Sequence, residues 1–208
     1  MKITVLGAGN MGAAFVTQFS KAGHQVRVTS RDLAKSKALT AGRANVTAVP
    51  AAEALGDSEV VVLATGYGDA VGALRGLGNL RGKIIVDITN PLTADYMGLT
   101  LGHSTSAAEE IAKAFPDAEV VKAFNTLFAQ VLSAGPDFKG QKAAVFVASD
   151  SARARQAATT LAEGLGYTVI DSGGLKNARY LEPLAALNIY LGYGAGRGTT
   201  IAPTWLSR

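Results

Sequence analysis

The chain has 208 residues, of which 48% are hydrophobic and 17% are charged, and its formal net charge is +4. This composition predicts one packed domain over residues 1–208 and excludes a disordered chain. The lack of cysteine excludes disulfides and cysteine metal sites. The basic residues are scattered, which argues against a nucleic-acid partner. Because we find neither an apolar run of membrane-spanning length nor a signal peptide, we expect a cytoplasmic protein with no membrane partner.

The N-terminal segment combines a strand, a glycine turn and a helix. Residues 3–6 form a short apolar run, and the pattern G-x-G-x-x-G follows at Gly7, Gly9 and Gly12. Apolar residues then recur at helical spacing over 11–22. In this context the pattern predicts a dinucleotide site. The first glycine allows the tight turn, the second lets the backbone approach a pyrophosphate, and the third lets the helix pack closely. The N–H groups at the start of the helix would face the phosphate.

The end of the second predicted strand, residues 25–29, indicates which dinucleotide binds. An NAD site would place a carboxylate about twenty residues after the glycine pattern. Here Thr29 is followed by Ser30 and Arg31, with Lys35 one turn into the next helix, and Asp32 is placed to cap that helix. A hydroxyl, a guanidinium and an ammonium suit a 2′-phosphate. We therefore expect NADP(H) in preference to NAD(H).

Strands and helices alternate along the rest of the chain. Further strands are predicted at 46–49, 59–64, 83–89, 119–123, 143–148 and 167–171. Helices are predicted at 33–40, 69–74, 107–115, 152–164 and 175–191. Ser106 and Glu109 have the spacing of a capping box, which supports the start of one of these helices. Alternating elements with nearly all-apolar strands predict an α/β fold with a doubly wound, mostly parallel sheet covered on both faces.

The C-terminal region 175–208 differs from this pattern and is expected to form a small lobe. A helix over 175–191 is followed by Gly192, Gly194, Gly196 and Gly198, which break regular structure. The apolar tail that follows contains Trp205. Such a tail buries itself against something, and we expect it to fold back over the cofactor site or to cross to a second subunit.

Small and amide residues follow three of the predicted strands. One strand ends in Ala64-Thr65, the next is followed by Asn90-Pro91, and a third ends at Ala123 with Asn125 close behind. Ligands of doubly wound sheets bind beyond the carboxyl ends of the strands. The small residues would allow the protein backbone to lie against a ribose, and the two amides could hold a carboxamide or a flat ring. Turn formation is the other role open to both asparagines.

No general acid or base stands out at these strand ends. We see no Ser–His–Asp order, no Lys–Asp or Lys–Tyr catalytic pair and no metal-binding pattern, and Asp87 is expected to cap a neighbouring loop. Carbonyl reduction requires a proton donor, whereas hydride transfer to a flavin-like ring depends mainly on alignment. The sequence therefore favours nicotinamide-to-flavin hydride transfer, with no catalytic side chain assigned.

These motifs occur together in a known group of proteins. The glycine turn, Ser30-Arg31 with Lys35, the stretches 86–92 and 121–126, and the late stretch 171–182 resemble the NADPH-dependent deazaflavin-coenzyme (F-420) reductase family and its bacterial dinucleotide-binding relatives. The chain is also similar to the cytoplasmic oxidoreductase domain of six-transmembrane metalloreductases. The resemblance covers nearly the whole chain.

The resemblance implies a Rossmann domain with a small C-terminal lobe, forming a homodimer and passing hydride between NADP(H) and coenzyme F-420, FMN or FAD. By position, Ser30, Arg31 and Lys35 look like the 2′-phosphate binders. The segment that looks like the pyrophosphate turn comprises Gly9, Asn10, Met11 and Gly12. The residues that look like the nicotinamide lining are Asn90, Pro91 and Asn125.

Two departures from the family pattern concern the acceptor side. The archaeal deazaflavin reductases carry Ile-Pro-Trp where this chain has Thr65-Gly66-Tyr67, and a histidine where it has Asn125.

Two other functions stay open. One is a non-catalytic module that senses NADPH. The other is an imine reductase of the pyrroline-carboxylate type, which this chain resembles in its glycine turn. Such reductases carry a long helical C-terminal domain, which we do not expect the roughly thirty glycine-rich residues here to replace.

Overall fold

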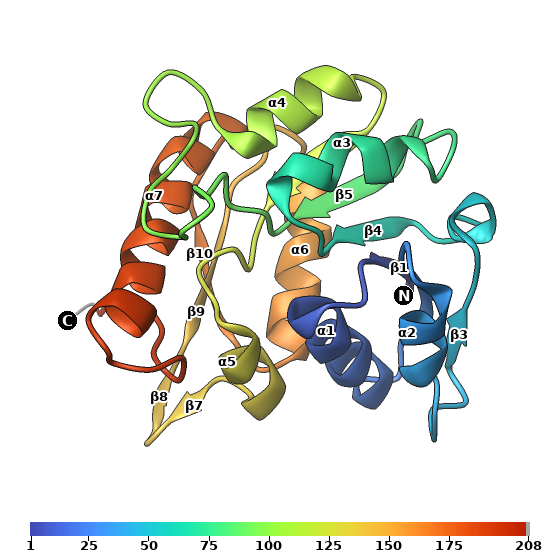
Figure 1. The fold of residues 1–208 in the computed structure, drawn as a ribbon, viewed down its shortest axis with the longest axis horizontal. Coiled ribbons are helices and arrows are strands. Elements are labelled where there is room, and N and C mark those ends of the chain that lie inside the picture. Colours follow the sequence, from blue (N-terminus) through green and yellow to red (C-terminus); the bar gives the residue numbers. More distant parts are fainter. Residues whose placement is uncertain (207–208) are drawn as a thin grey trace.

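A computed structural model of the chain, which describes residues 1–206, contains a six-stranded parallel sheet (Figure 1). Its strands are β1 (Lys2–Leu6), β2 (Gln25–Thr29), β3 (Val46–Ala48), β4 (Val60–Leu63), β5 (Ile84–Asp87) and β6 (Glu119–Lys122). Their order is β3-β2-β1-β4-β5-β6. The chain therefore winds outward in two directions from the centre of the sheet, and the switch between β1 and β4 is where ligands bind in such folds. The predicted doubly wound Rossmann-type sheet is confirmed.

Two further strands extend this sheet. β9 (Ala144–Val147) and β10 (Thr168–Asp171) are parallel to each other. An antiparallel bridge joins Lys122 of β6 to Ala148, with backbone N–H···O distances of 2.9 and 3.0 Å. β9 therefore runs against the direction of β6, which makes the whole assembly mostly parallel, as predicted.

Helices cover both faces of the sheet (Figure 1). They are α1 (Asn10–Lys21), α2 (Leu33–Ala38), α3 (Tyr67–Arg75), α4 (Ala107–Ala114), α5 (Ala129–Ala134), α6 (Ala152–Gly164) and α7 (Ala178–Ile189). Residues of α1, α5 and α6 share one buried cluster with alternate strand residues, and residues of α3 and α4 share a second cluster with the others. Both faces of each central strand are thus buried, which explains why these strands are mostly apolar.

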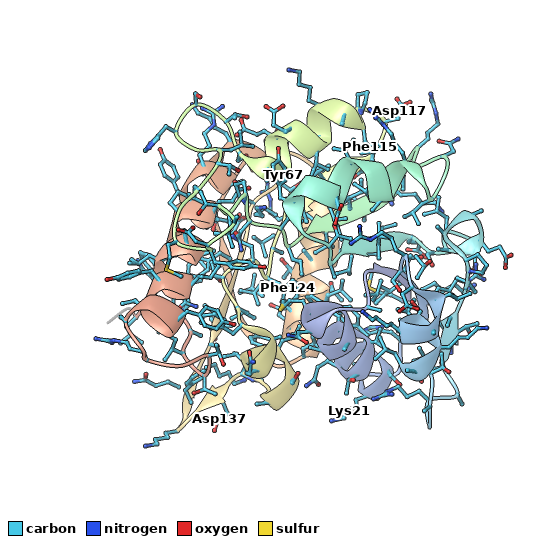
Figure 2. All side chains as sticks on the ribbon, in the orientation of Figure 1. Lys21, Tyr67, Phe115, Asp117, Phe124 and Asp137 are labelled. Atoms are coloured by element: carbon cyan, nitrogen blue, oxygen red, sulfur yellow. The ribbon has the colours of Figure 1, made fainter. Side chains whose placement is uncertain are left out.

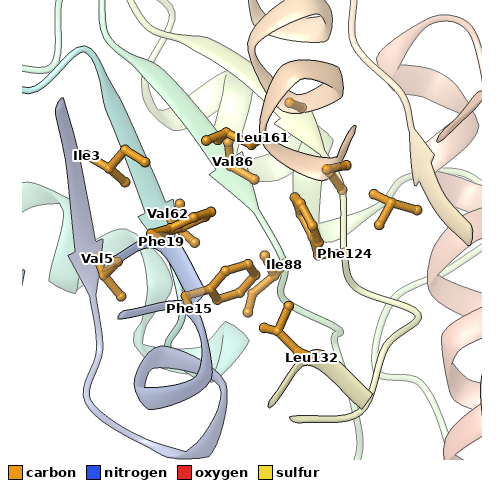
Figure 3. Packing of buried hydrophobic residues seen from close by; sticks show 14 of the residues in the cluster. Ile3, Val5, Phe15, Phe19, Val62, Val86, Ile88, Phe124, Leu132 and Leu161 are labelled. Carbon is orange, nitrogen blue, oxygen red and sulfur yellow. The ribbon is translucent and has the colours of Figure 1, made fainter. Parts of the chain in front are cut away.

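The larger cluster is built around aromatic rings (Figure 3). Phe15 and Phe19 of α1 stack with their ring centroids 5.3 Å apart, and Phe15 meets Phe124 edge to face at 5.2 Å. Leu161 of α6 and Val86 of β5 belong to the same cluster, and Phe15, Phe19 and Leu161 are fully buried. Because α1 follows the glycine turn directly, this packing fixes where the turn lies.

Two predicted helix starts are confirmed by their side-chain caps. Asp32 Oδ1 accepts a hydrogen bond from Ala34 N at 3.0 Å and caps α2. Ser106 Oγ accepts from Glu109 N at 3.2 Å and donates to the Glu109 carboxylate at 2.7 Å. Each cap satisfies N–H groups that the first turn of a helix leaves without a partner.

The C-terminal region is divided into shorter helical elements than predicted. In place of one helix over 175–191, a 3₁₀ turn (Leu175–Asn177) precedes α7, and a π-helical turn (Tyr190–Gly194) follows it. At Gly192 a Cβ would lie 2.6 Å from the Phe128 ring, so close packing accounts for this glycine. The prediction also missed α5, the 3₁₀ turn Ala51–Glu53 and the hairpin of β7 (Asp137–Phe138) and β8 (Gln141–Lys142).

The tail packs against β8 and β9 and does not cover the cofactor cleft as one expectation had it. Ile201 and Ala202 contact the larger core cluster, and Thr204 Oγ1 lies 3.5 Å from the Lys142 carbonyl. The Trp205 ring meets Phe146 of β9 edge to face at 5.6 Å. None of residues 199–206 lines the cleft at the ends of β1, β2 and β4. None of the helices in the described part of the chain has the length and apolar character needed to span a membrane.

Candidate functional site

The three glycines of the first turn each meet a different steric condition. Gly7 has φ +124°, and a Cβ there would lie 2.3 Å from the Ala64 carbonyl oxygen. At Gly12 a Cβ would lie 1.9 Å from the Gly7 carbonyl oxygen. At Gly9 a Cβ would meet no atom within 4 Å. Gly7 and Gly12 are therefore required by the fold, whereas the space beside Gly9 is open to a ligand.

Helix α1 begins directly in this open space. Gly9 is its N-cap residue, no side chain caps it, and its first turn has no acidic residue. Asn10, Met11 and Gly12 form that first turn, whose N–H groups have no partner within the helix. Their dipoles favour an anion at this position. The arrangement fits the pyrophosphate of a dinucleotide.

A cleft of about 760 Å³ extends from this turn between the ends of β1, β2 and β4. It is lined by seven of the residues predicted from sequence, namely Gly7, Gly9, Ser30, Arg31, Lys35, Ala64 and Thr65. The α3 wall presents Gly68, Gly72 and Gly76, spaced four residues apart. At Gly68 and Gly72 a Cβ would also meet nothing within 4 Å, so this wall leaves room for a flat group.

The β2 end of the cleft is lined by two cationic side chains, Arg31 and Lys35, and two carboxylates, Asp32 and Asp69. Arg31 and Lys35 are exposed, whereas the Ser30 hydroxyl donates to the Asp32 carbonyl at 2.7 Å. Arg31 also reaches across the cleft to Asp69 on α3, with 3.3 Å between Nη2 and Oδ2. The sequence analysis did not identify Asp69 as part of the site, because only the fold brings α3 opposite the end of β2.

The two predicted amides lie together at the ends of β5 and β6. Asn90 Nδ2 donates to the Asn125 carbonyl at 2.9 Å, and Asn125 Nδ2 donates to Asn90 Oδ1 at 3.0 Å. Asn125 Nδ2 also lies 2.9 Å from the Leu181 carbonyl of α7. Asn125 Oδ1 is buried and has no hydrogen-bond partner within residues 1–206. An unpartnered buried acceptor is costly, and a donor such as a carboxamide would satisfy it.

Seven predicted residues are not in the lining of the cleft. Asn10, Met11 and Gly12 form the first turn of α1, and Asn90, Pro91, Ala123 and Asn125 follow β5 and β6, the two strands that come next after β4 in the sheet. Pro91 is buried, and Ala123 is fully buried in the larger core cluster, so the Ala123 side chain is part of the core. Asn90 keeps partial exposure.

A buried ionic cluster lies behind these amides. Lys122 Nζ is 2.6 Å from Asp87 Oδ2 and 2.8 Å from Glu182 Oε1, and the three side chains are at most 1% exposed. Lys122 also donates to the Thr89 carbonyl at 2.7 Å. The sequence analysis saw no Lys–Asp catalytic pair, and it did not foresee that Lys122 and Asp87 form this buried ion pair. A charged residue inside each of two apolar strands was the available signal, but the order of the strands was needed to pair them.

The charge states of this cluster follow from its contacts. Burial would lower the pKa of Lys122, but the carboxylates of Asp87 and Glu182 outweigh it and raise that pKa. Burial raises the pKa of Glu182, against the opposing effect of Lys122. Asp87 Oδ1 accepts from Thr89 N at 2.8 Å, which confirms that Asp87 caps the neighbouring loop.

Tyr67 stands where the sequence departs from the family pattern. It begins α3 beside α4 (Figure 2) and packs partly buried against the smaller core cluster. Burial raises the pKa of its hydroxyl, and the carboxylates of Glu110, Glu182 and Asp87 raise it further. A raised pKa keeps this phenol neutral over the physiological range.

Comparisons with known proteins agree with this geometry. The family model described as NADP oxidoreductase coenzyme F420-dependent matches residues 2–91. The F420-dependent NADP reductase of Methanothermobacter marburgensis is 32% identical over 209 residues, which cover 92% of both chains. The metalloreductase STEAP3 of Rattus norvegicus is 33% identical over 184 residues, or 88% of this chain. The chain spans only about a third of that metalloreductase, 36% of its length.

Solved structures show the same architecture over different lengths. The crystal structure of an Arthrobacter sp. FB24 protein assigned to the F420-dependent NADP-reductases matches with a TM-score of 0.90 and 31% identity over the whole of both chains. A reductive aminase from Aspergillus terreus matches with a TM-score of 0.70 but only 21% identity, which shows the fold alone, and 62% of that chain is covered. This chain therefore belongs to the coenzyme F420-dependent NADP oxidoreductase family.

Proposed function

We propose that this oxidoreductase transfers hydride between NADPH and a deazaflavin of the F420 type, or a flavin. The observation that carries the proposal is the contrast between the two ends of the site. Ionisable residues line the cleft at its α2 and α3 end, whereas the other end offers two amides in front of a fully buried ionic cluster. An end of this kind can orient planar groups and has little to offer as a proton donor, which suits hydride transfer between rings.

Different residues of the site would bind different parts of the cofactor. Gly9 and the first turn of α1 would hold the pyrophosphate, and Ser30, Arg31 and Lys35 the 2′-phosphate. Asn90 and Asn125 would bind the nicotinamide carboxamide, for which the unpartnered Asn125 Oδ1 is a suitable acceptor. When bound, the reduced nicotinamide supplies the hydride.

The acceptor ring is proposed to lie beside the C-terminal end of α7. There Tyr190, Tyr193 and Met97 are 50%, 61% and 43% exposed, and the Tyr193 ring meets Phe128 edge to face at 5.7 Å. The loop that carries Met97 approaches this turn closely, since a Cβ on Gly194 would lie 3.3 Å from the Met97 sulfur. Exposed aromatic and sulfur surfaces are suited to stacking on a flat, weakly polar ring.

The test is NADPH oxidation followed at 340 nm with coenzyme F420, FMN, FAD and a cyclic imine offered in parallel. Turnover on a deazaflavin or flavin supports the proposal, and turnover on the imine alone contradicts it. Tight NADPH binding without any turnover would instead indicate the sensing module. The expected homodimer remains a prediction that sedimentation velocity can test.

A further inference from the structure

Lys122 contacts a residue adjacent to one strand-end amide and a residue adjacent to the bonding partner of the other. It sits at the end of β6 and is fully buried. Its ammonium makes three contacts, with Asp87 at 2.6 Å, the Thr89 carbonyl at 2.7 Å and Glu182 at 2.8 Å. These contacts join β5, the loop after it and α7.

The first route leads from Lys122 to Asn90. Thr89 is held on both sides, because its N–H donates to Asp87 Oδ1 at 2.8 Å and its carbonyl accepts from Lys122. Because both the N–H and the carbonyl of Thr89 are fixed, the direction in which the backbone continues to Asn90 is fixed as well. The Asn90 amide is then within reach of Asn125.

The second route leads from Lys122 to Asn125. Glu182 binds Lys122, and its other oxygen accepts from Ala107 N at 2.9 Å at the start of α4. This double attachment holds α7 against the sheet and against the start of α4. The residue before Glu182 is Leu181, whose carbonyl accepts from Asn125 Nδ2 at 2.9 Å. Lys122 therefore constrains the Asn125 amide through α7.

The charges of the cluster favour positioning over a direct chemical role. Two carboxylates face one ammonium, and the helix N-terminus at Ala107 supplies further positive potential to Glu182. All three side chains are closed to solvent. Groups that are paired and inaccessible cannot exchange a proton with a substrate, but they hold their neighbours rigidly.

We infer that Lys122 is a positioning residue for the nicotinamide half of the cofactor, acting through Asp87 on Asn90 and through Glu182 on Asn125. The inference rests on the proposed binding of NADPH in this cleft. It predicts that disturbing the cluster weakens recognition of the nicotinamide end and leaves recognition of the adenosine end intact.

The test compares two ligands in the full-length protein, NADPH and 2′,5′-ADP, which lacks the nicotinamide ribosyl phosphate. Glu182→Gln, Asp87→Asn and Lys122→Met are titrated with each ligand by calorimetry. We expect NADPH affinity to fall about tenfold or more, with 2′,5′-ADP affinity within about twofold of wild type. Lys122→Met leaves two buried carboxylates unpaired and can prevent folding, so the two isosteric variants carry the test if it does.

The matched control is Arg179→Ala. Arg179 also joins α7 to α4, through Glu109 at 2.7 Å, but contacts neither amide. This variant should lower the melting temperature without changing the ratio of the two affinities. Equal losses for both ligands in the cluster variants, or no loss in folded ones, would overturn the positioning role. A wild-type protein that binds neither ligand would instead refute the proposed function itself.

Discussion

Arg31 is expected to select NADPH over NADH, and Arg31→Ala measures its contribution. The Arg31 side chain is 89% exposed, and its contact with Asp69, itself 54% exposed, is 3.3 Å long. An ion pair this open to water is worth at most about 1 kcal/mol, so Asp69 can release Arg31 at little cost. A hydrogen bond to a charged group contributes about 1.5–3 kcal/mol. Losing it should weaken NADPH binding by about 10- to 100-fold.

The assay is a pair of titrations, with NADPH and with NADH, followed by calorimetry or by the fluorescence of the reduced nicotinamide. NADH lacks the 2′-phosphate, so its affinity should stay within about twofold of wild type in Arg31→Ala, because no charge-assisted bond is lost. Lys37→Ala is the matched control, since Lys37 is exposed on α2, the helix that follows Arg31, but does not line the cleft. Equal weakening of both nucleotides by Arg31→Ala would refute the assignment of Arg31 to the 2′-phosphate.

Three further predictions concern the turn, the core and a surface ion pair. Gly9→Ala should fold normally but bind NADPH less tightly. Gly12→Ala should lower the melting temperature, because its Cβ would lie 1.9 Å from a carbonyl oxygen. The opposite pattern in thermal unfolding and titration would contradict these roles. Leu161→Ala, at a fully buried site, should cost about 2–5 kcal/mol in urea unfolding, and a cost below about 1 kcal/mol would contradict the packing. Bonding to Arg179 lowers the pKa of Glu109 from 4.5, so this pair stabilises the fold above that pH and its contribution disappears as pH falls through the lowered pKa. Glu109→Gln should therefore destabilise the protein at neutral pH and cease to do so in acid, and a pH-independent difference would show that the charge is irrelevant.

The sheet could be predicted because its information is local. Strands such as β4 are runs of apolar residues between turn signals, and the glycine turn can only precede a helix that packs closely. The caps at Asp32 and Ser106 were also visible, since each involves residues two or three positions apart. Short elements such as α5 were missed because six residues without a side-chain cap give no clear periodicity.

The candidate site could be predicted only where one segment of chain supplies it. The glycine turn and the basic end of β2 each lie within a dozen residues. Asp69, by contrast, meets Arg31 across 38 positions (69 minus 31), and Lys122 meets Glu182 across 60 (182 minus 122). Pairings of this kind depend on strand order and on where α7 docks. No periodicity in the sequence reveals either.

The edge-to-face contact of Trp205 with Phe146 has a practical consequence for experiments in solution. Trp205 is the only tryptophan of the chain, so all indole emission comes from the C-terminal tail. The cleft that is proposed to bind NADPH contains no tryptophan, and reduced nicotinamide fluoresces at longer wavelength than indole. Nicotinamide emission can therefore report on occupancy of the cleft and indole emission on detachment of the tail. Because bound NADPH absorbs where indole emits, coupling is tested with 2′,5′-ADP, which does not absorb there. A change in indole emission when 2′,5′-ADP binds would mean that the two ends of the molecule are energetically coupled.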